Sequence, residues 1–112
     1  MRVINLETGM PTADQAVNTL NNRIYAERAS GARCVKVVHG YGSTGHGGAI
    51  RKAARQKLLD YKRRGIIRNL CYGEKLGPFN DEGRRFAESC PEIRSDIDWG
   101  RENPGITIVQ FK

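Results

Sequence analysis

The sequence predicts an α/β domain in which a mixed four-stranded sheet carries packed helices, in the order β-α-β-α-β-(α)-β. Short segments rich in Val and Ile alternate with longer segments whose apolar residues recur at helical spacing, a pattern that allows two right-handed crossovers. A length of 112 residues suits one core, and a hydrophobic fraction of 38% is ordinary for a globular protein. We therefore expect residues 1–112 to form a single domain.

The first half of the chain predicts two strands around one helix. An apolar run over residues 3–6 indicates the first strand. A helix follows from Thr12, whose spacing to Gln15 fits a capping box, and residues 30–31 end it. The second strand, Cys34–His39, is almost continuously apolar, which is typical of a strand covered on both faces. The core-facing stripe of the helix comprises Ala13, Ala16, Val17, Leu20 and Ile24.

The second half predicts a further helix over residues 49–65 and a third strand within residues 66–71. Residues 72–102 are acidic and irregular, with one short helix expected at 81–89. The clear last strand is Ile106–Phe111, which can run antiparallel to its neighbour.

Positive charge is concentrated in one element. The net charge is +7, yet residues 1–79 carry 14 Lys/Arg and 5 Asp/Glu, whereas residues 80–111 carry 4 and 7. The segment Arg51–Arg64 alone holds seven cations against Asp60. Such a cluster favours a polyanionic partner, the alternative being a solvated helix face.

Cysteine usage and hydropathy predict a cytoplasmic protein without metal or membrane contact. Cys34, Cys71 and Cys90 are odd in number and form no CxxC motif, so we expect unpaired thiols and no zinc site. No apolar run is long enough for a signal peptide or a membrane span.

A glycine-rich stretch at residues 40–48 lies between the second strand and the second helix. Free amide groups at a helix start bind anions, and glycines allow the backbone to come close to them. Arg51 and Arg55 are four residues apart and so share one face of the helix. The predicted phosphate-binding set is Gly40, Tyr41, Gly42, Ser43, Thr44, Gly45, Gly47, Gly48, Arg51, Lys52 and Arg55.

Two familiar nucleotide loops do not fit this stretch. A P-loop would need lysine and a hydroxyl where His46 and Gly47 stand. The dinucleotide pattern GxGxxG occurs at Gly40–Gly45, but it follows the second strand, and no acidic residue lies at 69–72. We therefore expect neither an NTPase nor a nicotinamide cofactor.

Two motifs resemble a known family. Val37–Gly42, followed by glycines and Ile50-Arg51, resembles the HGxG…[LI]R signature of Smr (small MutS-related) domains. Asn103–Val109 is similar to the closing GxGxTxV strand of that family. The resemblance covers most of residues 2–68 and 103–111. It implies a two-layer α/β sandwich similar to the C-terminal domain of translation initiation factor three, with DNA or RNA as partner and endonuclease activity in some members.

The chain departs from the family pattern at three places. The loop between His39 and Arg51 is about four residues longer than the compact family form. The early LDxH motif aligns with Ile4–Glu7, where Asn5 replaces aspartate and Glu7 replaces histidine. Glu7 is therefore a candidate carboxylate base in place of the histidine. Residues 72–102 resemble an insertion, which we expect to cover the basic face or to pair two chains.

Individual residues around the loop have alternative interpretations. His39 can contact phosphate or transfer a proton, or it can hold the loop by hydrogen bonding. Tyr41 can stack on a base or pack on the sheet, and Ser43 and Thr44 can bind phosphate or complete the turn. His46 is expected to face solvent.

Three functions follow from these interpretations. The first is a module that binds the sugar-phosphate backbone of nucleic acid. The second is an endonuclease that uses His39, with Glu7 as a further catalytic candidate. The third is a binder of a small phosphorylated ligand or nucleotide.

Overall fold

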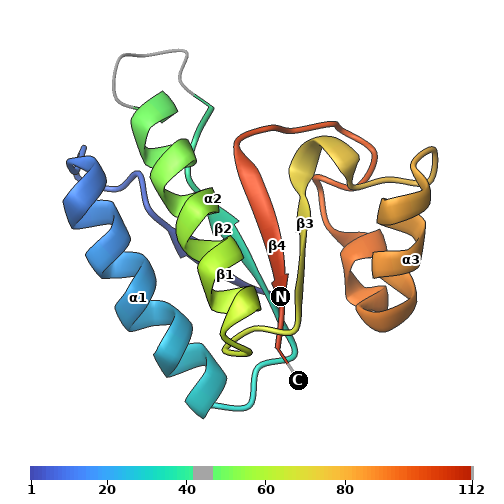
Figure 1. The fold of residues 1–112 in the computed structure, drawn as a ribbon. Helices are drawn as coiled ribbons and strands as arrows, with labels where there is room; N and C mark the ends of the chain where they lie inside the picture. The colour runs from blue at the N-terminus through green and yellow to red at the C-terminus, as the bar shows by residue number, and fades with distance from the viewer. Residues whose placement is uncertain (42–46, 112) are drawn as a thin grey trace.

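One mixed four-stranded sheet forms the centre of the molecule (Figure 1). The computed structural model describes residues 1–41 and 47–111. The strands are β1 (Arg2–Asn5), β2 (Cys34–Val38), β3 (Asn69–Tyr72) and β4 (Ile106–Gln110), in the spatial order β1-β2-β4-β3. β1 is parallel to β2, and β4 is antiparallel to both β2 and β3. The predicted mixed α/β fold is therefore confirmed, and the last strand is antiparallel to both of its neighbours.

Two long helices cover one face of the sheet, α1 (Ala13–Ala29) and α2 (Gly47–Arg63) (Figure 1). Thr12 and Gln15 form the expected capping box before α1. This layer on the sheet is the expected sandwich, because the apolar stripes of both helices meet the inward side chains of the strands. Its buried core includes Ile4, Leu20, Ile24, Val35, Val37, Ala54, Leu58, Tyr61 and Val109.

Residues 73–105 cover part of the opposite face. They form the short 3-10 helix η1 (Gly73–Lys75), the helix α3 (Asp81–Ser89) and the 3-10 helix η2 (Pro91–Ser95). α3 has the bounds that the sequence predicts, and Asn80 caps it by accepting from the backbone of Glu82. The acidic segment thus forms a second core together with residues of the sheet. This core consists of Cys34, Cys71, Leu76, Phe86, Ala87, Cys90, Ile93, Ile106 and Ile108.

The prediction of unpaired thiols is wrong for two of the three cysteines. Cys34 and Cys90 form a disulfide across a sequence separation of 56 residues, while Cys71 is a buried free thiol. Burial raises the pKa of Cys71 to about 12, so it stays protonated. The spacing of the cysteines does not reveal the pair, because the packing of residues 73–105 on β2 brings the two together.

A buried ion cluster also attaches residues 73–105 to β2. Lys36, the one polar side chain within β2, is 7% exposed. Its Nζ lies 2.9 Å from an Asp96 carboxylate oxygen and 2.7 Å from one of Asp98. Burial acts to lower the pKa of Lys36, but the two carboxylates outweigh it and raise the pKa. Asn103 completes the cluster by donating to Asp98 at 3.0 Å.

None of the helices within residues 1–41 and 47–111 has the length and apolar character that crossing a membrane requires.

Candidate nucleic-acid interface

The glycine-rich stretch begins where the ends of β1 and β2 meet the start of β4. The backbone amides of His39 and Gly40 both donate to the carbonyl of Gly105 at 3.0 Å. Gly40 has a φ of +75°, a left-handed conformation that side chains disfavour. These hydrogen bonds and the conformation of Gly40 therefore hold the backbone in place where it leaves the sheet after β2.

Glu7 lies against this exit point. A methyl group added at Gly40 would come within 2.5 Å of Glu7 Oε2, so the carboxylate packs directly on the Gly40 backbone. Asn5 supports the position because its side-chain oxygen accepts from the Glu7 amide at 2.8 Å. The two residues that depart from the family motif thus form one turn beside the loop.

His39 is fully buried, and both ring nitrogens are bonded. Nδ1 lies 2.8 Å from the Gly40 carbonyl oxygen, and Nε2 lies 2.9 Å from Thr107 Oγ1. Burial, together with the nearby charges of Arg55 and Arg51, lowers the pKa of His39 to about 4. The imidazole is therefore neutral at pH 7.

The hydrogen-bond pattern also determines its tautomer. The Gly40 carbonyl oxygen can only accept, so Nδ1 of the neutral ring must carry the proton. Thr107 Oγ1 accepts from Arg55 Nε at 3.2 Å and donates its hydroxyl proton to His39 Nε2. Nε2 is then the acceptor, and Nδ1 carries the proton that is donated to Gly40. His39 consequently holds the first residue of the loop.

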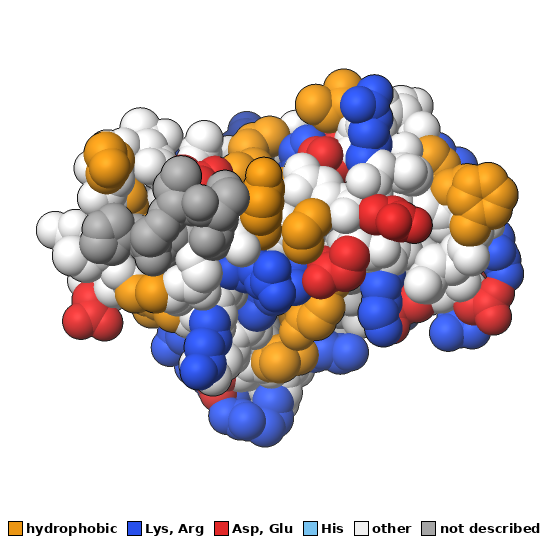
Figure 2. Space-filling view, turned by 90° about the horizontal axis from the view of Figure 1, so that it is seen from above, with side chains coloured by type: hydrophobic (Ala, Val, Ile, Leu, Met, Phe, Trp, Pro, Cys, Tyr) orange, Lys and Arg blue, Asp and Glu red, His pale blue; other side chains and the backbone are white. Residues whose placement is uncertain are grey.

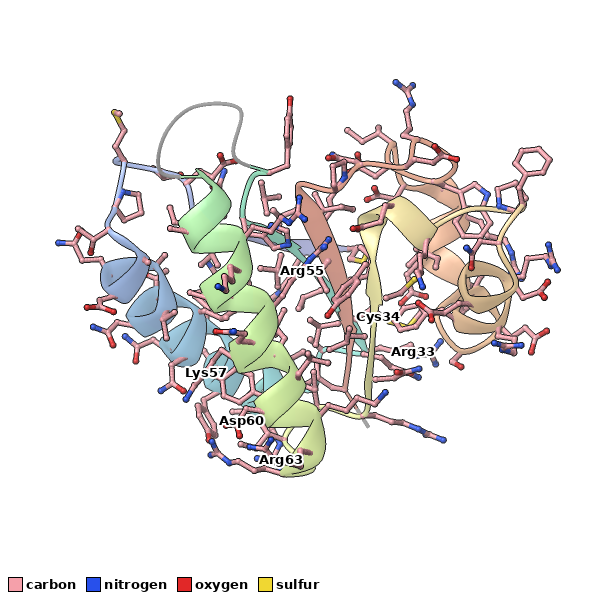
Figure 3. The ribbon with its side chains drawn as sticks, turned by 45° about the horizontal axis from the view of Figure 1, so that its top comes forward. Arg33, Cys34, Arg55, Lys57, Asp60 and Arg63 are labelled. Carbon is pink, nitrogen blue, oxygen red and sulfur yellow. A yellow bond between two sulfur atoms is a disulfide. The ribbon has the colours of Figure 1, made fainter. Side chains whose placement is uncertain are left out.

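Arg55 is the centre of this network and is only 8% exposed. Its two terminal nitrogens bind both carboxylate oxygens of Glu74, at 2.9 and 2.7 Å. One of them also donates to the carbonyls of Pro104 and Ile106, and the guanidinium lies 4.0 Å from the Tyr72 ring centroid. Figure 3 shows Arg55 directed from α2 toward the sheet, whereas Lys57 lies on the other side of that helix.

This geometry corrects the predicted place of Arg55 in the site. The spacing of four residues puts Arg55 on the same face of α2 as Arg51, but its donors are already used inside the protein. Burial opposes ionisation of Glu74, yet the hydrogen bonds from Arg55 outweigh it and lower the pKa of that carboxyl. The Arg55–Glu74 pair is therefore charged at pH 7, and its guanidinium is not available to an external phosphate.

Arg51, Lys52 and Tyr41 remain accessible at the start of α2. The first turn of α2 contains no acidic residue, Arg51 is half-buried, and Lys52 is exposed. None of the ion pairs among the described residues involves these two cations. Tyr41 is 55% exposed and packs with one ring edge toward Gly105. Figure 2 views this end of the molecule and shows several Lys and Arg side chains on its surface.

Several predicted residues lie outside the described ranges, namely Gly42, Ser43, Thr44, Gly45 and His46. Gly47 and Gly48 begin α2.

Thr107 and Glu74 bind His39 and Arg55 in this network, although neither is among the residues predicted from the sequence. The sequence does mark Thr107, because it is the lone hydroxyl within the apolar strand Ile106–Gln110. The structure shows that it is fully buried. Glu74 carried none, since it lies in the irregular segment after β3.

Comparison with known proteins shows the family and the fold of this chain. Residues 8–70, more than half of the chain, match the family profile of the Smr domain. The structure is similar to the Smr domain of Thermus thermophilus MutS2, with a TM-score of 0.61 and 20% sequence identity over 100% of this chain and 99% of that chain. Curated protein sequences yield no match. This chain belongs to the Smr domain family.

Proposed function

We propose that this chain binds nucleic acid through the sugar-phosphate backbone at the start of α2. The observation that carries the proposal is the pair Arg51 and Lys52 near the start of α2, a helix whose first turn has no acidic residue and which follows a glycine-rich stretch of sequence. Family membership supports it, because Smr domains bind or nick nucleic acids.

The physical reason lies in the charges that converge there. The first amides of an α-helix lack internal partners, and the helix dipole places partial positive charge at the same end. Arg51 adds a full charge close to this end, since it is among the charges that lower the pKa of both His39 and Glu74. An anion is stabilised by all of these groups together. Tyr41 offers an aromatic ring for base stacking at the rim.

Within this proposal His39 and Arg55 position the site without touching phosphate. His39 fixes the Gly40 carbonyl, and Arg55 fixes Thr107 and thereby His39. A backbone contact of this kind reads little sequence, so DNA and RNA of different sequences should bind with similar affinity.

Binding of labelled DNA and RNA oligonucleotides at two salt concentrations tests the proposal. Arg51→Ala should weaken all sequences alike, by about fivefold at 0.1 M salt for one lost phosphate contact on a single strand. Arg28→Ala is the matched control, because Arg28 is an exposed cation in the last turn of α1. Equal binding by the two variants, or a loss confined to certain sequences, contradicts the proposal.

An endonuclease is the second candidate, and the position of Glu7 favours it. Its carboxylate packs on Gly40 beside the start of α2, where it can take a proton from the water or 2′-hydroxyl that attacks a bound phosphodiester as the P–O bond to the leaving oxygen breaks. A proton transfer by His39 would require the bond from its Nδ1 to the Gly40 carbonyl to open. Nicking of plasmid DNA or cleavage of RNA that is lost in Glu7→Gln, with binding retained, is the expected result. Unchanged cutting by Glu7→Gln removes Glu7 from the mechanism.

We infer a cytoplasmic location as part of the same proposal, which the disulfide makes testable. Cytosolic thiols are kept reduced, so Cys34 and Cys90 would be present there mainly as thiols. Alkylation of the protein in intact cells, followed by mass analysis, measures the fraction of each state. A fully oxidised pair contradicts the cytoplasmic location.

A further inference from the structure

A second basic surface lies away from the start of α2, in a groove between α2 and α3. The groove follows β3, an edge strand of the sheet, and has a volume of about 560 Å³. Its walls include Leu59 and Lys62 from α2, Leu70 and Tyr72 from β3, and Arg85 and Phe86 from α3. We call it the β3 groove.

The β3 groove carries excess positive charge. Lys62, Lys75 and Arg85 line it together with a single acidic residue, Glu82. Within the described part of the chain, none of these three cations takes part in an ion pair.

The cations next to Lys62 in the sequence behave differently. Arg63 and Arg64 both pair with Asp60, and the Arg64 hydrogen bond is the main cause that lowers the pKa of this carboxyl. Figure 3 shows Asp60 and Arg63 together near the end of α2. Among the described residues Lys62 has no such acidic partner and is therefore available to an anionic ligand in the groove.

The β3 groove and the start of α2 lie on the same side of that helix, with the buried Arg55 and Leu58 between them. Arg51 and Lys62 are eleven residues apart, which brings them to nearly the same angle around the helix axis. The separation along the axis is about 16 Å, which matches roughly five nucleotides at 3.4 Å each along one duplex strand.

A second hollow extends the groove in the other direction. It has a volume of about 570 Å³ and shares Ser89 with the β3 groove. Arg33 and Arg68 line it, with Glu88 as its acidic residue. Net positive charge therefore continues past the far end of β3.

We propose that the β3 groove is a second binding site for the backbone of the same nucleic-acid strand. The strand would contact Arg51 and Lys52, follow α2, and place further phosphates against Lys62, Lys75 and Arg85. This inference rests on the proposed function and extends its footprint to a surface made partly by residues 73–105. The lining favours a phosphate backbone, because three cations without an ion pair to residues 1–41 or 47–111 face a single acidic residue and Phe86 is only 3% exposed.

A charge-neutralised pair tests the groove directly. The variant Lys62→Gln/Arg85→Gln removes one cation from each wall, and Arg28→Gln/Arg94→Gln removes two exposed cations elsewhere. Binding of a four-nucleotide and a sixteen-nucleotide single strand is measured from low to moderate salt, after thermal unfolding has shown that both variants fold. The Arg51→Ala variant is measured with the same strands. An acidic, Glu-rich peptide is measured as an alternative ligand.

The groove variant should bind the long strand roughly twentyfold more weakly than the control at 0.1 M salt, with the slope of log K against log salt reduced by about 1.4. The short strand should bind the groove variant within about twofold of the control, since it fills only the start of α2. Equal binding of the long strand by both variants overturns the groove while Arg51→Ala still reports on the proposed function. Binding of the acidic peptide alone, lost in the groove variant, overturns both and assigns the groove to a protein partner.

Discussion

The helix layer of α1 and α2 and the segment of residues 73–105 are attached to the same sheet by different kinds of contact. The helix layer is held mainly by a continuous apolar core, in which Leu20, Leu58 and Tyr61 are fully buried. Residues 73–105 have a smaller core and add a disulfide, the Lys36 cluster and the Arg55–Glu74 pair.

The difference has a physical consequence. Burial of apolar area is largely insensitive to pH and to redox state, whereas ion pairs and disulfides respond to one or the other. Changes in solution conditions should therefore loosen residues 73–105 before they affect the helix layer. Because Glu74 belongs to this segment and holds Arg55, such loosening reaches the candidate site.

The largest expected effect comes from opening the disulfide. A bond between residues 56 apart in the sequence stabilises the fold by about 4 kcal/mol in the chain-entropy account. Urea unfolding with and without reductant should show this loss. The Cys34→Ala/Cys90→Ala variant should be insensitive to reductant, and equal stability of the native protein in both conditions would contradict the prediction.

Acid should produce the next largest effect, through His39. The pKa of His39 is about 4 in the folded protein and near 6.5 in an unfolded chain, so below pH 6.5 the unfolded state binds more protons. Stability contributed by the neutral imidazole is complete above pH 6.5 and is lost as the pH falls toward 4, by about 3 kcal/mol.

Two variants separate this effect from general acid destabilisation. His39→Gln should have a flatter profile between pH 6.5 and 4, because it has no group that titrates there. Leu58→Ala should lower stability by about 3 kcal/mol at every pH, because it removes only buried apolar volume. Parallel profiles for the native protein and His39→Gln would show that His39 does not titrate in this range.

The smallest expected effect belongs to Thr107, where the two regions meet. Thr107→Val leaves His39 Nε2 and Arg55 Nε without their shared partner and should cost about 1–3 kcal/mol. Thr107→Ser keeps the hydroxyl and should behave as the native protein does. The ¹⁵N shifts of His39 should show a proton on Nδ1 in the native protein, and a proton on Nε2 would contradict the proposed network.

The sequence predicts the helix layer well because its signals are local. The capping residues Thr12 and Gln15 and the apolar periodicity of α1 and α2 each lie within one element. The short helix at Asp81–Ser89 was predicted with correct bounds for the same reason. The sequence does not predict the contacts that attach this segment to the sheet, because the partners of Cys90, Asp96 and Asp98 lie far away in the sequence.

The candidate site was predicted in part. The end of β2 and the basic first half of α2 are close to where the sequence places them. Periodicity gives the face of a helix on which a side chain lies, but it does not give depth. Arg51 and Arg55 therefore look alike in the sequence, although the structure buries Arg55 against Glu74 and leaves Arg51 accessible.

Local signals in the sequence are sufficient for the order of the elements, the antiparallel option for the last strand and the concentration of positive charge in α2. These properties depend on residues that are close to one another in the chain. The pairing of the cysteines, the enclosure of Arg55 and the tautomer of His39 become visible in the folded molecule alone. Each of these depends on groups from β2, α2, β4 and residues 73–105 that meet only when the sheet has formed.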